Sequence, residues 1–599
     1  GEGVKQEREL LNLCRRYNMR MIGPNCVGLM DTHTPLNASF ARGFPNKGNI
    51  SFISQSGAML LSILDWSHSR GLGYSRFISL GNKADLDETD FIESCANDPN
   101  TRVILCYIED VTDGDRFVKV CAEACKIKPI IILKSGTSAA GAQAASSHTG
   151  ALAGSNRAYD TAFHQSGVLR VSDMNDLFDL ASAFSTQPLP AGDRVAIVTN
   201  AGGAAIVATD TVEKYGLQMA RFNKETIDKL RENLPKESNI YNPVDILGDA
   251  REERYRFALE QVLQDENVDN VLVLLCPTAV IEPEKTAKTI AEMKKAYPNK
   301  PVFAVYMGGQ ALAGGRNILI QEAVPTFTFP EPAVRAVQGL VRYANYKKHR
   351  TEARPVELKG VDQNAVKATF YDALKDRRLA LLGYEASRVM EAYGIPISKI
   401  ELATTAAEAQ AISEKLGYPV VLKISSPRIA HKTDVGGVEI GLHDSKAVAK
   451  GFERIMERVK RHLPDTPIYG IEVQKMVDEG VEVIIGISRD VQFGHLVVFG
   501  LGGIYVNLFE DVSFRLASAL TTREAVLEMI SETKAYSLLK GYRGKKPADM
   551  EALIDAILRT ARLAMDFKEI TEMDINPLRV HQRGATALDV KITIEQAGL

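Results

Sequence analysis

Short apolar runs alternate with amphipathic stretches through the first half of the chain. The runs occupy residues 50–53, 103–108, 130–133, 195–199, 271–275 and 302–306. Each run is apolar throughout rather than alternating, which is typical of strands in a parallel sheet covered on both faces. The helical patterns between them predict two doubly wound α/β domains, joined at the Pro- and Gly-containing residues 188–192.

The first residues carry a different signal. Residues 7–16 predict an amphipathic helix, and residues 19–22 predict a strand leading into the turn Gly23-Pro24-Asn25. One helix and one strand have nothing to pack against, so we interpret them as the last αβ unit of a further domain. At ~150 residues per domain, the 599 residues suggest three or four domains.

Two segments repeat one plan. Residues 51–71 and 196–216 each predict a strand, a tight turn of small residues and a helix ending near a glycine. The turns contain Ser56-Gly57 and Gly202-Gly203. The free amides of each helix's first turn would face the carboxyl edge of a sheet, where they suit an anion. Either the two helix starts converge on one anion or the repeat is purely structural.

A loop of small residues at 146–154 contains a single histidine, His148. Glycine and alanine leave the backbone amides of such a loop uncovered, so something small and charged can approach. An imidazole there is a candidate nucleophile that could accept and pass on a phosphoryl group. An ordinary loop histidine would give the same pattern.

The last third of the chain carries residues suited to a nucleotide. Lys423 lies on a predicted strand, where an ammonium could be fixed over phosphates. Asp574, Asn576 and Asp589, at the ends of two predicted strands, offer the hard oxygen ligands that Mg²⁺ prefers. The glycines at 436–437 and 500–503 could close over a triphosphate. Each carboxylate taken alone would equally suit an ordinary turn.

Composition narrows the function classes. A formal net charge of −3 gives no argument for nucleic acid or an anionic membrane as partner. No apolar run is long enough to span a bilayer, and the charged first residues do not resemble a signal peptide. The seven cysteines are scattered without metal-type spacing, which favours a reducing, cytoplasmic location.

Several longer motifs together resemble those of the ADP-forming acyl-CoA synthetases, relatives of succinyl-CoA synthetase. The motifs are SQSGA, ISLGNKADLDETDF, SSHTGALAGS, NAGGAA, YNPVDILGDA, HKTDVGGV and DINPL, and the resemblance runs along the whole chain. It implies two flavodoxin-like domains followed by an ATP-grasp domain. The implied boundaries are 1–32 for the end of a CoA-binding Rossmann domain, 33–187 and 188–345 for the flavodoxin-like domains, 346–380 for a linker and 381–599 for the ATP-grasp domain.

The resemblance also implies site residues. His148 would be phosphorylated, Glu109 would be its acidic partner, and His431 would be a second phosphate carrier. The helix starts at Ser56-Gly57 and Gly202-Gly203 would receive the phosphate. Glu472, Gln474 and Glu482 resemble the adenine- and ribose-contacting segment of ATP-grasp proteins, although solvent-facing strand residues would look the same.

The implied reaction joins a carboxylic acid, acetate or another short-chain acid, to CoA with ATP and Mg²⁺, through a phosphohistidine and an acyl phosphate. The alternatives are a non-catalytic acyl-CoA- or nucleotide-sensing module and the regulatory body of a protein lysine acetyltransferase. We expect a homo-oligomer, because phosphate must travel between distant sites. With only the end of the CoA-binding domain present, we expect the chain to bind CoA poorly.

Overall fold

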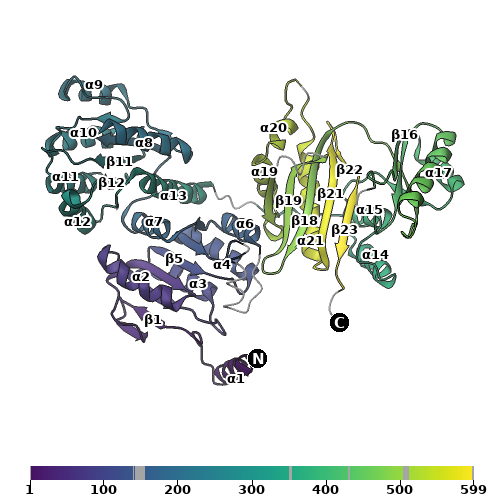
Figure 1. Cartoon of the computed structure of the whole chain (residues 1–599), viewed down its shortest axis with the longest axis horizontal. Coiled ribbons are helices and arrows are strands. Elements are labelled where there is room, and N and C mark those ends of the chain that lie inside the picture. Colours follow the sequence, from purple (N-terminus) through teal and green to yellow (C-terminus); the bar gives the residue numbers. More distant parts are fainter. Residues whose placement is uncertain are drawn as a thin grey trace. The chain divides into compact units, whose positions relative to one another are not determined.

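The computed structural model describes residues 2–138, 140–141, 155–349, 354–429, 432–503, 511–544 and 546–596 (Figure 1). The chain divides into two compact units. Unit 1 comprises Gly1–Asn156 and Phe163–Thr351, and unit 2 comprises Arg157–Ala162 and Glu352–Leu599. None of the described helices combines the length and the hydropathy needed to cross a bilayer.

The chain begins with the expected helix, α1 (Glu2–Arg16). The predicted strand at residues 19–22 is wrong, because this segment pairs with a loop instead of a strand. The Met21 amide donates to an oxygen of Asp85, and the Met21 carbonyl accepts from the amide of Leu86. The polar backbone is therefore satisfied without a sheet partner.

The first sheet of unit 1 has seven strands in the order β2-β1-β4-β3-β5-β6-β7. The strands are β1 (Gly28–Asp31), β2 (Leu36–Ser39), β3 (Lys47–Ser54), β4 (Tyr74–Ser79), β5 (Val103–Ile108), β6 (Ile130–Lys134) and β7 (Leu169–Val171). β3 to β7 are parallel, and β1 adds an antiparallel edge. Counted along the chain, the parallel strands have the flavodoxin order 2-1-3-4-5, with the switch point between β3 and β5.

Helices cover both faces of this sheet. They are α2 (Gly57–Ser69), α3 (Glu88–Asn97), α4 (Gly114–Ile127) and α7 (Met174–Thr186). α6 (Asn156–Ser166) lies between β6 and β7 in the chain, but its residues Arg157–Ala162 belong to unit 2. Their starts follow from the sequence: Asp113 caps α4, and Asp87 with Asp90 forms a capping box at α3. The apolar runs predicted at residues 103–108 and 130–133 are buried strands, as expected.

The second sheet repeats the plan, in the order β10-β8-β11-β12-β13 with β9 beside β8. Its strands are β8 (Arg194–Thr199), β9 (Gln218–Met219), β10 (Val244–Asp245), β11 (Asn270–Leu275), β12 (Val302–Tyr306) and β13 (Thr326–Phe327). Its helices are α8 (Gly202–Lys214), α9 (Lys224–Asn233), α10 (Glu252–Gln264), α11 (Pro283–Ala296), α12 (Ala313–Gln321) and α13 (Pro330–His349). All the strands are parallel, and the switch point lies between β8 and β11.

One hydrophobic core joins the two sheets of unit 1. Phe52 of the first sheet, Phe303 of the second and Val337 of α13 belong to the same cluster of buried side chains. α13 packs against both α7 and α8. The two flavodoxin-like domains are therefore held in one body by shared apolar burial.

Unit 2 has two antiparallel sheets (Figure 1). The four-stranded sheet runs β14 (Ile400–Ala403), β17 (Gly470–Lys475), β15 (Val420–Ser425), β16 (Val438–Leu442). The six-stranded sheet runs β20 (Val512–Leu516), β19 (Gly494–Leu501), β18 (Val481–Asp490), β21 (Ile570–Val580), β22 (Ala585–Ala587), with β23 (Val590–Ile594) also on β21. The helices of unit 2 are α14 (Gln363–Lys375), α15 (Gly383–Ala392), α16 (Ala406–Leu416), α17 (Ser445–His462), α19 (Arg523–Ser531), α20 (Ala535–Leu539) and α21 (Met550–Asp566).

Gly48, near the start of β3, is where we expect a small substitution to strain unit 1. A Cβ at Gly48 would lie 2.3–2.5 Å from backbone atoms of Gly73, which cannot rotate away. Gly48→Ala should lower the free energy of unfolding by about 1–3 kcal/mol through overpacking. Urea unfolding followed by the fluorescence of Trp66, the only tryptophan, measures this change. Gly3→Ala, with open space around its Cβ, should not destabilise the protein; equal losses in both variants would contradict the steric explanation.

Candidate functional site

The switch point of the first sheet brings Gln55 and Glu109 together. Ser54 and Tyr107 are register partners in β3 and β5, so the residues just after each strand are neighbours. The Gln55 side-chain oxygen accepts hydrogen bonds from the amides of Glu109 and of Asp110, the latter at 3.1 Å. Carboxyl ends of strands at such a crevice are the usual ligand positions in open α/β sheets.

The two predicted phosphate-binding helix starts follow β3 and β8, the first parallel strand of each sheet along the chain. Ser56 caps α2 and accepts from the Met59 amide at 3.3 Å. At α8 the capping position is Ala201, whose side chain makes no cap hydrogen bond. Gly202 and Gly203 are exposed, and nothing would lie within 4 Å of a Cβ at Gly203. The Ala201 side chain thus leaves the first-turn amides of α8 uncapped, as an incoming anion needs. A carboxylate oxygen of Asp245 is also close, 3.1 Å from where a Cβ at Gly202 would lie.

Lys134 is a residue of this edge that the sequence analysis missed. It ends β6, pairs in register with Ile108, and is 5% exposed. Burial lowers the pKa of Lys134 to about 8; nearby Arg170 lowers it too, while Asp110 and Glu109 oppose the shift. A lysine directly after the apolar run 130–133 was the available signal.

Both predicted histidine carriers lie outside the described residues. His148 falls within residues 142–154 and His431 within residues 430–431. The described residues nearest to His431 are Ile429 before it and Lys432 after it.

In unit 2, Lys423 and Gln474 share one acceptor. The Lys423 ammonium donates to the carbonyl of Leu588 at 2.8 Å, and the Gln474 amide donates to the same oxygen at 3.2 Å. Burial lowers the pKa of Lys423, and neighbouring Lys432 lowers it further. Both side chains come from the four-stranded sheet and fix the segment that carries Asp589.

Glu472 is buried, with 1% of its surface exposed. Its carboxylate accepts from the Ser425 hydroxyl at 3.0 Å and pairs with the Lys432 ammonium at 3.3 Å. Gly383 leaves room for it, because a Cβ there would lie 2.6 Å from both carboxylate oxygens. Gln474 is 3% exposed. The alternative that these two strand residues face solvent is therefore wrong.

Lys432 bridges two carboxylates. Its ammonium lies 3.3 Å from Glu472 and 3.8 Å from Asp589. Burial pushes the pKa of Lys432 down, but the two carboxylates more than offset this, so the pKa lies above its ordinary value. Its place in the HKTD motif beside the predicted histidine was the signal for this role.

Glu482 and Asn576 both lie beside Gly503. The Asn576 side-chain oxygen accepts from the Gly503 amide at 2.9 Å. Glu482 pairs with Arg579 at 2.8 Å, and its other carboxylate oxygen faces Gly503. Glu482 therefore already has a cationic partner.

Asp574 fits a divalent cation. Asp574 and Asn576 lie within one strand, β21, and not at its end as expected, while Asp589 lies just before β23. The backbone amide of Asn576 donates to the backbone carbonyl of Asp589 at 3.1 Å. Among the described residues, no group donates a hydrogen bond to one buried carboxylate oxygen of Asp574. Burial raises the pKa of Asp574 to about 6, and the nearby Asp589 and Glu572 carboxylates add to it.

Few protein ligands are available there. Among the described residues, no cluster of three or more His, Cys, Asp or Glu side chains could hold a metal ion. Two carboxylates and one amide oxygen nevertheless suit Mg²⁺, which keeps several waters and shares phosphate oxygens. The residues present therefore fit the ion.

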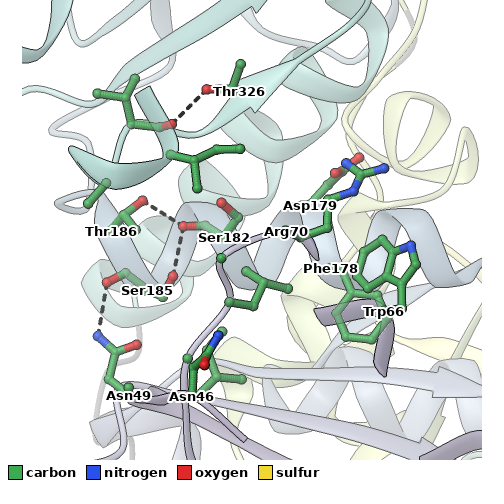
Figure 2. Close-up of a pocket in the computed structure, with 18 of the residues that line it drawn as sticks. Asn46, Asn49, Trp66, Arg70, Phe178, Asp179, Ser182, Ser185, Thr186 and Thr326 are labelled. Atoms are coloured by element: carbon green, nitrogen blue, oxygen red, sulfur yellow. Dashed lines mark hydrogen bonds between the residues drawn. The ribbon is translucent and has the colours of Figure 1, made fainter. Parts of the chain in front are cut away.

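A pocket of about 320 Å³ lies elsewhere in unit 1, at the start of β3 (Figure 2). Its hydroxyl and amide groups bond within the protein: the Asn49 amide donates to the Ser185 carbonyl, and the Ser185 and Thr186 hydroxyls donate to the Ser182 carbonyl. The pocket lies at the opposite end of the strand from Gln55. We therefore do not assign the reaction to it.

Asp574→Asn should stabilise the metal-free protein. A raised carboxyl pKa means that the folded state holds a proton more tightly, so stability falls as pH rises from about 4 through about 6. In chelator at pH 7.5, the free energy of unfolding of unit 2 should rise by about 1–2 kcal/mol, and the gain should vanish near pH 4. Urea unfolding followed by circular dichroism measures it.

Asp549→Asn is the matched control of opposite sign. The Asp549 carboxylate accepts from the amides of Ala552 and Gly584, which lowers its pKa. This variant should lose stability above pH 4. A gain in Asp549→Asn, or no gain in Asp574→Asn, would contradict the assignment of the unpaired carboxylate.

Comparison with known proteins covers nearly the whole chain. Family models match as a succinyl-CoA ligase-like flavodoxin domain at residues 47–184, a ligase-CoA domain at 195–355 and an ATP-grasp domain at 372–594. Acetate–CoA ligase (ADP-forming) I of Archaeoglobus fulgidus is 43% identical over 593 residues, covering 99% of this chain and 84% of that protein. 4-Hydroxybutyrate–CoA ligase (ADP-forming) of Nitrosopumilus maritimus is 40% identical, with 99% and 85% covered.

A solved structure gives the same result. The acetyl-CoA synthetase 1 of Ca. Korarchaeum cryptofilum, in complex with phosphate and ADP, is 36% identical with a TM-score of 0.56. The match covers 57% of this chain and 75% of that chain. With the relatives above, it accounts for both flavodoxin-like domains and the ATP-grasp domain. This chain therefore belongs to the family of the ADP-forming acetate–CoA ligases, the ADP-forming acyl-CoA synthetases.

Proposed function

We propose that this ADP-forming acyl-CoA synthetase activates acetate or another short-chain carboxylic acid through a phosphohistidine at His148. The single observation that carries the proposal is the 43% identity to one acetate–CoA ligase along 593 residues, which spans the switch-point domains and the nucleotide-type residues alike. The relatives reported above are named as ligases, which argues against a sensing module or a regulatory body.

The reaction has three steps. The γ-phosphoryl group of ATP moves to a histidine nitrogen, and ADP leaves. The phosphohistidine then transfers the group to the substrate carboxylate, which gives an acyl phosphate. The CoA thiol attacks the acyl carbon, loses its proton and displaces inorganic phosphate. Dividing the reaction into covalent steps replaces one difficult step by easier ones.

The chain's own residues supply charge and position for these steps. Lys423 and Lys432 would hold the nucleotide phosphates, with Glu472, Gln474 and Glu482 towards the adenine and ribose. Asp574, Asn576 and Asp589 would hold Mg²⁺, which neutralises charge on the phosphates when bound. Glu109 would orient the imidazole of His148, and the helix starts at Ser56-Gly57 and Gly202-Gly203 would receive the phosphate. His431 would relay the phosphoryl group between the two units.

The setting of the reaction follows from the same residues. We place the enzyme in the cytoplasm, where its seven free thiols would stay reduced. We expect a homo-oligomer and small-molecule partners only: the acid, CoA, ATP and phosphate. We also propose that the chain is divided into the five segments named above, with boundaries after residues 32, 187, 345 and 380.

Lys423→Met should weaken ADP binding at least about tenfold, since it removes a half-buried ammonium that is already fixed in place. Isothermal titration of ADP into the full chain measures the affinity. Lys415→Met is the control, because the Lys415 ammonium is exposed and pairs with Glu401 at the surface. Unchanged ADP affinity in Lys423→Met would contradict the nucleotide site.

His148→Asn should abolish nearly all phosphorylation of the protein. The chain is incubated with γ-labelled ATP and Mg²⁺, and the acid-labile, base-stable label is counted. His462→Asn, at the exposed end of α17, should keep full label. A sensing module would never acquire the label, and label that persists when both His148 and His431 are replaced by asparagine would refute the two carriers.

A further inference from the structure

The side chain of Gln55 binds the backbone of the turn that carries Glu109. Gln55 lies between β3 and α2, and its side-chain oxygen accepts from the amides of both Glu109 and Asp110. Its side-chain nitrogen donates to the Asp110 carbonyl at 2.7 Å. One carboxamide thus fixes three backbone groups, and with them the direction in which the Glu109 side chain leaves the sheet.

A buried ion pair holds the same turn from the other side. The Lys83 ammonium lies 2.9 Å from the Asp110 carboxylate and 3.1 Å from Glu88, and it also donates to the Asp110 carbonyl at 3.1 Å. Glu88, which is fully buried, accepts from the Thr112 amide at 2.9 Å. Lys83 and Glu88 belong to the ISLGNKADLDETDF motif, to which the proposed reaction gives no role.

The second sheet shows what the carboxamide does without an acid. Asn200 follows β8 as Gln55 follows β3, and it both accepts from the Cys276 amide at 2.9 Å and donates to the Cys276 carbonyl at 2.9 Å. Cys276, the residue after β11, thus occupies the position that Glu109 occupies after β5. Gln55, one methylene longer, reaches the amides of two successive residues and so fixes the turn on which the carboxylate lies.

We propose that Gln55 is a positioning residue for phosphoryl transfer, acting through Glu109, with Lys83 and Glu88 holding the far side of the same turn. The proposal rests on the proposed function, in which Glu109 orients the imidazole of His148. Gln55 also directly precedes Ser56-Gly57. The helix start and the carboxylate to which the proposed function gives the phosphate and the histidine are therefore tied together by one side chain.

The test is a double-mutant comparison of phosphohistidine formation from γ-labelled ATP. Gln55→Ala should lower the label formed in the first seconds by about ten- to a hundredfold, because small displacements of positioned groups cost that much. In the Glu109→Gln background, Gln55→Ala should change the label by less than about twofold. Residues that act through one group are non-additive in this way, whereas independent structural losses multiply.

Controls separate positioning from damage to the fold. ADP affinity, set by unit 2, should be unchanged in Gln55→Ala. Asn49→Ala should keep full label, since it removes a carboxamide bond to the Ser185 carbonyl near the other end of β3. If Gln55→Ala does not fold, Gln55→Glu takes its place: it keeps an acceptor for both amides, loses the bond to Asp110, and should lose label by the same non-additive rule.

Each result decides between the two claims. Full label in a folded Gln55 variant, or a loss that multiplies with that of Glu109→Gln, overturns the positioning role and leaves the proposed function intact. Full label in Glu109→Gln instead overturns the role of Glu109 in the proposed function. Loss of label in both single variants, with no further loss in the double variant, supports the proposal.

Discussion

The reversal of strand order in each parallel sheet is the constraint on which the catalytic edge depends. At the switch point the connections from two neighbouring strands leave towards opposite faces, so the backbone groups just beyond the strands lose their ladder partners. In the first sheet the side chain of Gln55 takes over these bonds, and in the second sheet Asn200 does so. The helix that follows each of these residues begins with amides available to an anion. In both sheets, therefore, a carboxamide satisfies the backbone directly before the helix start at which we propose phosphate binding.

The nucleotide side is governed by a different balance, that of buried charge. Lys432 stands between Glu472 and Asp589, so that most of the desolvation cost is offset within the protein before any ligand binds. Asp574 is the exception, with an unpaired oxygen and a raised pKa. An unbalanced carboxylate beside balanced ones is a place where a cation gains most on entering. The proposed affinity for Mg²⁺ would therefore follow from the one carboxylate oxygen that the described residues leave without a hydrogen bond.

The sequence predicts what local composition controls. The strands at residues 103–108 and 302–306 match because they are buried on both faces and need apolar side chains throughout. Local composition also predicted the helix starts at Ser56-Gly57 and Gly202-Gly203 and the strand that carries Lys423. The segment 19–22 was not, because its partner is a loop 60 or more residues away. The roles of Gln55, Lys83 and Lys134 depend on strand order, which spacing along the chain does not contain. His148 and His431 lie outside the described residues, so their carrier roles stay predictions.

The matching carboxamides of Gln55 and Asn200 also suggest how the two sheets are related by descent. Parallel strands with a switch point beside β3 or β8, and a carboxamide directly after that strand, are what duplication of one domain would leave behind. After such a duplication, the position beyond the third strand became Glu109 in one copy and Cys276 in the other. The inherited scaffold would then have diverged at one position of the sheet edge, which holds a carboxylate in one half and a thiol in the other.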